Sequence, residues 1–169
     1  MAEAARARGI PTEVQFLGPE TGHQIAQQYG RADLVAANNV FAHVPDIRGF
    51  AGEVLKIKSD LLEFLLTAAA EGKSVAGYGA PGKGNTLLNH CGIRSDLLQY
   101  TVDRSPVKQG KFLPGTHVPI YAPERLAETQ PDYILVLPWN LRDEITRQLD
   151  YVRSWGGRLV FPIPALEVV

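Results

Sequence analysis

Apolar and polar positions follow two different periods along most of this chain. Between residues 46 and 73 apolar residues recur every four positions, which predicts a helix with one apolar face. Residues 133–137 form a continuous apolar run, which is typical of a parallel strand buried on both faces. Residues 141–152 return to the helical period, and a last apolar strand follows at residues 158–162. Helix and strand therefore alternate from about residue 57 onward, which predicts an α/β fold with a Rossmann-like parallel sheet and helices on both faces.

The first part of the chain shows a weaker pattern. The sequence predicts a short helix at residues 2–8 and, from the alternation of polar and apolar residues, a strand at residues 12–17. Residues 21–29 predict a helix with Thr21 as its N-cap, and residues 33–39 predict a second strand that ends in a polar loop. This β-α-β opening has no glycine-rich turn of its own, which indicates a partial segment of a sheet.

Two regions follow from these patterns: a partial segment at residues 1–56 and a Rossmann-like domain at residues 57–169. The apolar content of 45% and the charged content of 21% are ordinary for a soluble globular protein. A net charge of -1 argues against a nucleic-acid binder held by bulk electrostatics. No apolar run reaches membrane-spanning length and no signal-peptide pattern opens the chain, so we expect a cytoplasmic protein without a membrane partner.

The cysteine content limits the chemistry further. Cys91 is the single cysteine, so it cannot form an internal disulfide. No group of Cys and His residues has metal-ligand spacing, and no nucleophile elbow or Cys/His pair is present. We therefore expect no metal in this chain.

A glycine-rich stretch, S-V-A-G-Y-G-A-P-G-K-G-N at residues 74–85, lies between a predicted strand and a predicted helix. Three of its glycines fit the pattern G-x-G-x-x-G of dinucleotide-binding turns, namely Gly77, Gly79 and Gly82. Asp103 follows about 20 residues later, at the end of the next predicted strand, where such folds place an acidic residue. The stretch also resembles a Walker A loop, but Gly84 stands where a magnesium-binding Ser or Thr is required, which excludes an NTPase.

The order of strand, tight turn and helix predicts a site for an anion or a nucleotide, in which backbone N–H groups and the ammonium of Lys83 bind phosphate. Two further loops should reach the same edge of the sheet, because ligands of open α/β sheets bind at the carboxyl ends of the strands. One follows Asp103 and is rich in lysine, and the other contains Trp139, an indole for stacking, and Asn140, an amide for base or ribose edges. The candidate substrate-binding residues are Gly77, Gly79, Ala80, Lys83, Gly84, Asn85, Asp103, Lys108, Lys111, Trp139 and Asn140.

Each of these residues also has a structural interpretation. The glycines could form only a tight turn, and the two loop lysines could be solvated. Asn140 precedes acidic residues of a predicted helix, so its side chain could be a plain N-cap, and Asn85 could cap its own helix. Trp139 could belong to the core, and Asp103 could merely close a strand turn. The convergence of the three loops favours the site more than any single residue does.

The first region offers one candidate for acid–base chemistry. Asn38, Asn39 and His43 fall in one predicted loop after a strand, and a His beside amides can accept a proton near neutral pH. An isolated loop His is also common as a structural or exposed residue, so the residue pattern leaves both interpretations open.

Three stretches of the chain resemble the S-adenosylmethionine (SAM)-dependent nucleotide-sugar C-methyltransferases. They are A-A-N-N-V-F-A-H-V-P-D at residues 36–46, K-Q-G-K-F-L-P-G-T at residues 108–116 and P-W-N at residues 138–140, together with the glycine-rich stretch. The first is similar to a strand and loop of the family's methyltransferase domain, and the others are similar to its C-terminal Rossmann-like domain. The resemblance covers nearly the whole chain in two blocks.

The resemblance implies a function and a set of roles. These enzymes use SAM to methylate a carbon of a deoxysugar linked to a nucleotide diphosphate, usually dTDP. Asn39 and His43 match the family's catalytic Asn and His, and the His helps to position or deprotonate the sugar. The loops around Lys83, Lys108 and Asn140 match the domain that helps to hold the nucleotide-sugar.

The sequence also departs from the family. The family's zinc-binding cysteine cluster has no counterpart, nor does the glycine-rich motif that begins its SAM fold. A Tyr-x-Glu-His stretch with the main catalytic base is absent, and roughly a hundred residues are missing near residue 56, by comparison with a full methyltransferase domain. We therefore expect a chain that retains mainly the nucleotide-sugar-binding domain and is inactive alone.

Two other functions stay open from the sequence. One is a small NAD-binding Rossmann domain that uses the three glycines and Asp103. The other is a non-catalytic module that binds a nucleotide, or that pairs with a second copy through the exposed edge of its unfinished N-terminal sheet.

Overall fold

The computed structural model describes residues 2–15, 19–30 and 47–169. Contacts between residues divide the chain into two compact units, Met1–Ala51 and Gly52–Val169. The sequence predicts a boundary at residue 56 between a methyltransferase-like segment and a Rossmann-like domain. This boundary describes which family domain each region resembles, and it stays a prediction.

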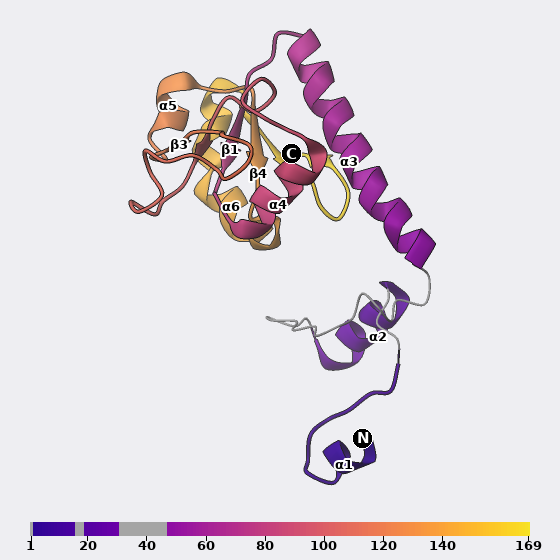
Figure 1. The fold of residues 1–169 in the computed structure, drawn as a ribbon. Coiled ribbons are helices and arrows are strands. Elements are labelled where there is room, and N and C mark those ends of the chain that lie inside the picture. Colours follow the sequence, from indigo (N-terminus) through magenta and orange to yellow (C-terminus); the bar gives the residue numbers. More distant parts are fainter. Residues whose placement is uncertain (1, 16–18, 31–46) are drawn as a thin grey trace. The chain divides into compact units, whose positions relative to one another are not determined.

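The first unit contains two of the predicted helices, α1 (Ala2–Arg6) and α2 (Pro19–Tyr29) (Figure 1). Helix α2 begins two residues before Thr21, so the prediction that Thr21 caps it is wrong. Gly30 ends α2 with a φ of 84°, a left-handed conformation that glycine adopts without strain.

The strand predicted at residues 12–17 is wrong over its described part. Residues 12–15 form no strand. Instead, the guanidinium of Arg6 donates to the Thr12 carbonyl and the hydroxyl of Tyr29 donates to Glu13. Side chains, and not a neighbouring strand, therefore provide the hydrogen bonds of residues 12 and 13. An alternating pattern produces a strand only where a partner strand completes its hydrogen bonds. The strand predicted at residues 33–39 lies outside the described residues.

The second unit is built on a six-stranded sheet in the order β3-β2-β1-β4-β5-β6. Its first five strands in sequence are parallel, and β6 is antiparallel to β5. This order confirms the predicted Rossmann-like α/β fold, and it places the topological switch point between β1 and β4. The strands are β1 (Val75–Tyr78), β2 (Thr101–Val102), β3 (Ile120–Tyr121), β4 (Tyr133–Val136), β5 (Arg158–Phe161) and β6 (Glu167–Val168).

Helices cover both faces of this sheet, as predicted (Figure 1). Buried side chains of α3 (Ile47–Ala70) and α4 (Gly82–Cys91) form one core cluster with one face of the strands. Buried side chains of α5 (Arg125–Thr129), α6 (Arg142–Gln148) and the 3-10 helix η3 (Asp150–Trp155) form a second cluster with the other face. Neighbouring residues of one strand enter different clusters, because successive side chains of a strand point to opposite faces.

Two element predictions required correction. The helix predicted over residues 141–152 divides at Leu149 into α6 and η3, before Gly156 ends it. Strand β6 was not predicted, because a two-residue strand has too few positions to show a period. It extends the sheet beyond β5, where the Val169 and Leu159 backbones exchange two hydrogen bonds of 2.9 Å.

A carboxylate ties the start of β4 to the start of β1, at the edge of the sheet opposite to the glycine-rich turn. Asp132 accepts hydrogen bonds from the N–H and the hydroxyl of Ser74 and forms an ion pair of 2.9 Å with Lys73. The Ser74 N–H, followed by the Lys73 ammonium, lowers the pKa of Asp132 to about 2, against an ordinary value of 3.8. The contribution of this group to stability is therefore complete above pH 4 and is lost as the pH falls through 2.

We expect Asp132→Asn to lower the free energy of unfolding by about 1 kcal/mol or less at pH 7, because the side chain is partly exposed. The difference from the wild type should shrink as the pH falls from 4 to 2, where the wild-type carboxylate becomes protonated. Urea unfolding at several pH values measures this. Asp150→Asn, which removes a more exposed pair with Arg153, is the matched control. A difference that does not change with pH would contradict the assignment.

Candidate functional site

The glycines of the glycine-rich stretch at residues 74–85 have three different roles. A Cβ at Gly77 would lie 2.6 Å from Oγ1 of Thr101, and one at Gly84 would lie 2.7 Å from Cβ of Leu137, so these two permit close packing of backbone. Gly79 has a φ of 83°, and a Cβ there would lie 2.7 Å from Cδ of Pro138. Gly82 has no neighbour within 4 Å of a built Cβ, so the space beside it is open. The structural interpretation thus holds for three glycines, and Gly82 alone faces open space.

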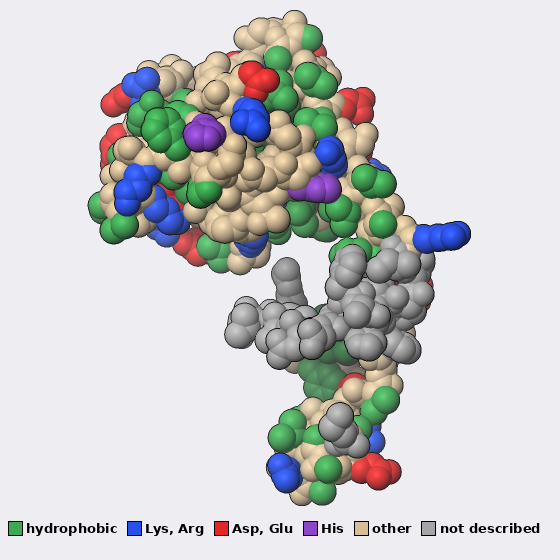
Figure 2. Space-filling view, viewed as in Figure 1, with side chains coloured by type: hydrophobic (Ala, Val, Ile, Leu, Met, Phe, Trp, Pro, Cys, Tyr) green, Lys and Arg blue, Asp and Glu red, His purple; other side chains and the backbone are tan. Residues whose placement is uncertain are grey.

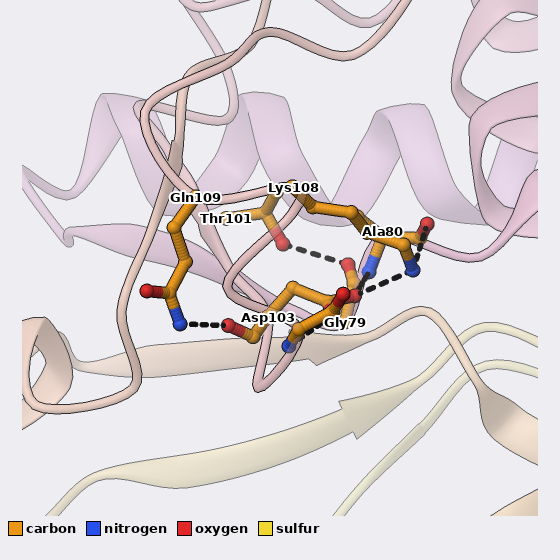
Figure 3. A network of polar contacts seen from close by, with 7 residues as sticks. Gly79, Ala80, Thr101, Asp103, Lys108 and Gln109 are labelled. Atoms are coloured by element: carbon orange, nitrogen blue, oxygen red, sulfur yellow. Dashed lines mark hydrogen bonds and ion pairs between the residues drawn. The ribbon is translucent and has the colours of Figure 1, made fainter.

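Asp103 follows β2 and joins the glycine-rich turn to the lysine-rich loop (Figure 3). Its Oδ2 accepts hydrogen bonds from the Ala80 N–H at 2.7 Å and from Nζ of Lys108 at 3.0 Å. Its Oδ1 accepts from the Ser105 N–H at 2.8 Å, and its carbonyl accepts from Nε2 of Gln109. Burial raises the pKa of Asp103, but the bonds from Ser105, Lys108 and Ala80 outweigh burial and hold the pKa below its ordinary value. Asp103 is therefore a charged carboxylate whose two oxygens both accept protein hydrogen bonds.

The same network occupies the backbone of the turn itself. The Gly79 carbonyl accepts from Oγ1 of Thr101 at 2.8 Å, and the Ala80 carbonyl accepts from Nζ of Lys108 at 3.1 Å. The Gly79 N–H continues the β1–β2 ladder by donating to the Val102 carbonyl. The sequence analysis did not single out Thr101 or Gln109. Thr101 lies two residues before Asp103, so the two share one face of the predicted strand, and this spacing was the available indication.

Lys83 connects the two sides of the switch point. It lies in the first turn of α4, and its ammonium donates to Oδ1 of Asn140 and lies 4.7 Å from the centre of the Trp139 ring. Trp139 and Asn140 belong to η2 (Trp139–Leu141), directly after β4. The N-cap of α6 is Leu141, so the interpretation of Asn140 as a plain N-cap is wrong. Burial lowers the pKa of Lys83.

The first turn of α4 has no side chain as its cap. Its N-cap is Pro81, which makes no side-chain cap hydrogen bond, so the interpretation of Asn85 as the cap is wrong. Asn85 lies inside the helix, and its carbonyl and side chain both accept from Nδ2 of Asn89. The first backbone N–H groups of the helix therefore have no partner within the helix and no side-chain cap, and Lys83 lies in the same turn.

A cavity of about 300 Å³ adjoins this turn. It is at the lower end of the range of roughly 300–1,000 Å³ that ligand pockets occupy. Most of its lining is apolar, and two lysines and one amide also line it. It is lined by Ala80, Pro81, Gly82, Asn85, Lys108, Lys111, Phe112, Leu113, Pro114 and Ile120.

Lys111 and Phe112 are the residues of this cavity that are most available to a ligand. Lys111 forms no ion pair with the residues that the structure describes, whereas Lys108 is already paired with Asp103. Phe112 is 61% exposed, although it is a large apolar side chain. The sequence reasoning missed Phe112; its position in a loop of lysine, glycine and proline is the signal that would have found it.

The structure thus brings together Lys83, Trp139 and Asn140 as one group, and Lys108 and Asp103 as another. Asn39 and His43 lie outside the described residues, so their predicted catalytic roles stay predictions. In the parts that the structure describes, no group of three or more His, Cys, Asp or Glu residues could hold a metal ion.

The visible face of the second unit in Figure 2 carries basic and acidic side chains scattered among apolar and neutral ones. Within the described ranges, no helix combines the length and the apolar character that crossing a membrane requires.

Comparison with known proteins gives one strong similarity. The family described as the C-methyltransferase C-terminal domain matches residues 34–164. The chain belongs to this family. The C-methyltransferase NovU of Streptomyces niveus is 40% identical over 122 residues, which cover 72% of this chain and 29% of NovU. The chain therefore spans less than a third of the length of this relative.

Two solved structures resemble this C-methyltransferase family member more distantly. UDP-D-quinovosamine 4-dehydrogenase from Vibrio fischeri has 16% identity and a TM-score of 0.42, with 57% of this chain and 93% of that chain covered. RSP, a Rex-family repressor, has 15% identity and a TM-score of 0.40, with 96% of this chain and 68% of that chain covered. Membership of the C-methyltransferase family confirms the resemblance seen in the sequence motifs.

Proposed function

We propose that the second unit binds the nucleotide-sugar substrate of a SAM-dependent sugar C-methyltransferase. The observation that carries this proposal is the position of Lys83. Its ammonium lies beside the uncapped first turn of α4 and against Trp139 and Asn140, at the carboxyl ends of β1 and β4. A helix N-terminus with an adjacent cation suits a diphosphate.

The cavity beside this turn suits the rest of such a ligand. Its apolar lining and the exposed ring of Phe112 would bind a planar base, and the ammonium of Lys111 would donate to a phosphate. We propose dTDP as the nucleotide, because the family resemblance implies a dTDP-linked deoxysugar.

The second unit fits the methyl donor poorly. In Rossmann-like folds the carboxylate after the second strand binds ribose hydroxyls, but both oxygens of Asp103 already accept protein hydrogen bonds. The same observation disfavours the NAD-binding alternative. When bound, SAM would supply the methyl group; we propose that the second unit serves the acceptor, and that Asn39 and His43 of the first region act at the acceptor carbon, with His43 as a proton acceptor.

Calorimetric titration of the purified chain with dTDP, SAM and NAD in separate experiments tests this function. We expect dTDP to bind, and SAM and NAD to bind more weakly or not at all. Binding of NAD alone would replace the proposal with the dehydrogenase-like alternative. Binding of none of the three would favour a non-catalytic interaction module, and a mass that rises with concentration would then support pairing of two copies.

We expect His43→Ala to leave the dTDP affinity unchanged within about twofold, because position 43 belongs to the first compact unit and the proposed nucleotide site belongs to the second. The same titration measures this. A loss of dTDP binding in this variant would contradict the assignment of the nucleotide site to the second unit.

A further inference from the structure

The turn after β1 has no free backbone donor at Gly79 or Ala80 to offer to an anion. All four N–H and carbonyl groups of Gly79 and Ala80 already have protein partners. The Gly79 N–H donates to Val102. The other three groups bond to Thr101, Asp103 and Lys108 (Figure 3). In dinucleotide-binding folds the backbone of this turn approaches the pyrophosphate directly. Here a carboxylate stands at that place.

The carboxylate is also held firmly. Asp103 accepts bonds from three segments: the turn through Ala80, the backbone of Ser105 and the side chain of Lys108. Its Oδ2 lies 2.7 Å from the Ala80 nitrogen. The negative charge of this carboxylate would repel a phosphate that approached the same N–H group. An anion that bound the Ala80 N–H would have to break its hydrogen bond to Asp103 and approach the negative charge of that carboxylate.

The next N–H groups along the chain are free of this carboxylate. They belong to the first turn of α4, where Pro81 provides no side-chain cap and a Cβ built on Gly82 has no neighbour within 4 Å. Lys83 adds a cation at the same turn, and its ammonium is held by Asn140.

We propose that Asp103 is a positioning residue that determines the specificity of this site: it closes the Gly79–Ala80 turn to phosphates and confines anion binding to the first turn of α4. Asp103 therefore touches no ligand. It acts through Ala80 and Lys108, excludes the extended pyrophosphate path of dinucleotide cofactors and leaves a site for one compact diphosphate. The proposal rests on the proposed function only in taking a phosphate as the ligand.

Nuclear magnetic resonance of the ¹⁵N-labelled 169-residue chain, titrated with inorganic pyrophosphate, tests this inference. In the wild type we expect the amide signals of Gly82, Lys83 and Gly84 to shift, whereas that of Ala80 stays in place and exchanges slowly with solvent. A shift of Ala80 comparable to those of the α4 amides, or no shift in α4, would overturn the proposal without any substitution.

Two variants separate the role of Asp103 from a general effect on folding. Asp103→Asn retains an oxygen for the Ala80 N–H, so the slow exchange and the pattern of shifts should persist. Asp103→Ala should speed the exchange of the Ala80 amide at least tenfold and add Ala80 to the residues that pyrophosphate shifts. An identical pattern of shifts in a folded Asp103→Ala variant would overturn the proposal.

Failure of this inference and failure of the proposed function give different results. If pyrophosphate shifts the α4 amides as expected but dTDP does not bind in calorimetry, the function is wrong and the role of Asp103 stands. If dTDP binds and pyrophosphate shifts Ala80, the function stands and the role of Asp103 is wrong.

Discussion

Replacement of Lys83 by alanine should weaken dTDP binding by about 1–3 kcal/mol, which corresponds to roughly 5- to 150-fold in the dissociation constant. The reason is that Lys83 is the cation at the uncapped turn of α4, and its ammonium is already oriented by Asn140 and by the Trp139 ring. Calorimetry of the variant against the wild type at one fixed salt concentration measures the change, since screening alters any charge-assisted contact.

Three further variants distinguish the charge of Lys83 from its packing. Lys83→Met keeps an apolar stem on Trp139, so it should lose as much affinity as the alanine variant. Lys83→Arg should retain part of the affinity. Lys56→Ala removes a lysine from α3, where it pairs with Asp60, and should leave affinity unchanged. Equal affinity of Lys83→Ala and wild type would remove Lys83 from the site.

The pH dependence of dTDP binding provides a second test of Lys83. Burial lowers the pKa of this ammonium below 10.5, and the proposed contact requires the charged form. The affinity should therefore fall as the pH rises, and it should begin to fall earlier than an exposed lysine would cause. The alanine variant should lack this component.

The second large effect is expected in the core under α3. Leu65 is 1% exposed and packs in the cluster that joins α3, α4 and the sheet, so Leu65→Ala should lower the free energy of unfolding by about 2–5 kcal/mol. Urea unfolding followed by circular dichroism measures this. A loss of this size is a large fraction of the 5–15 kcal/mol that is typical for whole domains.

The adjacent residue is the matched control. Leu66 has the same side chain on the same helix but is 56% exposed, so Leu66→Ala should change the free energy of unfolding by about 0.5 kcal/mol or less. Equal destabilisation by both substitutions would contradict the packing of α3 on the sheet.

Much of the second unit was predictable from local patterns. The four-residue spacing of Ile57, Leu61 and Leu65 predicted α3 because a helix presents every third or fourth residue to one side. The continuous apolar run predicted β4 because a parallel strand is buried on both faces. The glycine-rich turn and the P-W-N triplet likewise indicated which loops meet, since parallel strands place their carboxyl ends at one edge.

The roles of individual polar residues were not predictable in the same way. Asn140 and Asn85 both had the local pattern of helix caps, yet neither caps a helix, because α4 and α6 begin at other residues. The amide oxygen of Asn140 instead accepts a hydrogen bond from Lys83. Asp103 had the spacing of a ribose-binding acid, yet its oxygens are taken by Ala80, Ser105 and Lys108. Spacing records where a side chain falls along the chain and says nothing of which donors surround it.

The sequence by itself therefore determined the Rossmann-like class, the edge of the sheet that carries the candidate site and the C-methyltransferase family. These depend on periodicity and on motifs, which are local properties of the chain. Only the tertiary structure decided that the Gly79–Ala80 turn is closed by Asp103 and that Lys83 is held against Trp139 and Asn140. The two hydrogen bonds among those contacts join residues 23 and 57 positions apart, and it is the packing of the strands that brings these groups within bonding distance.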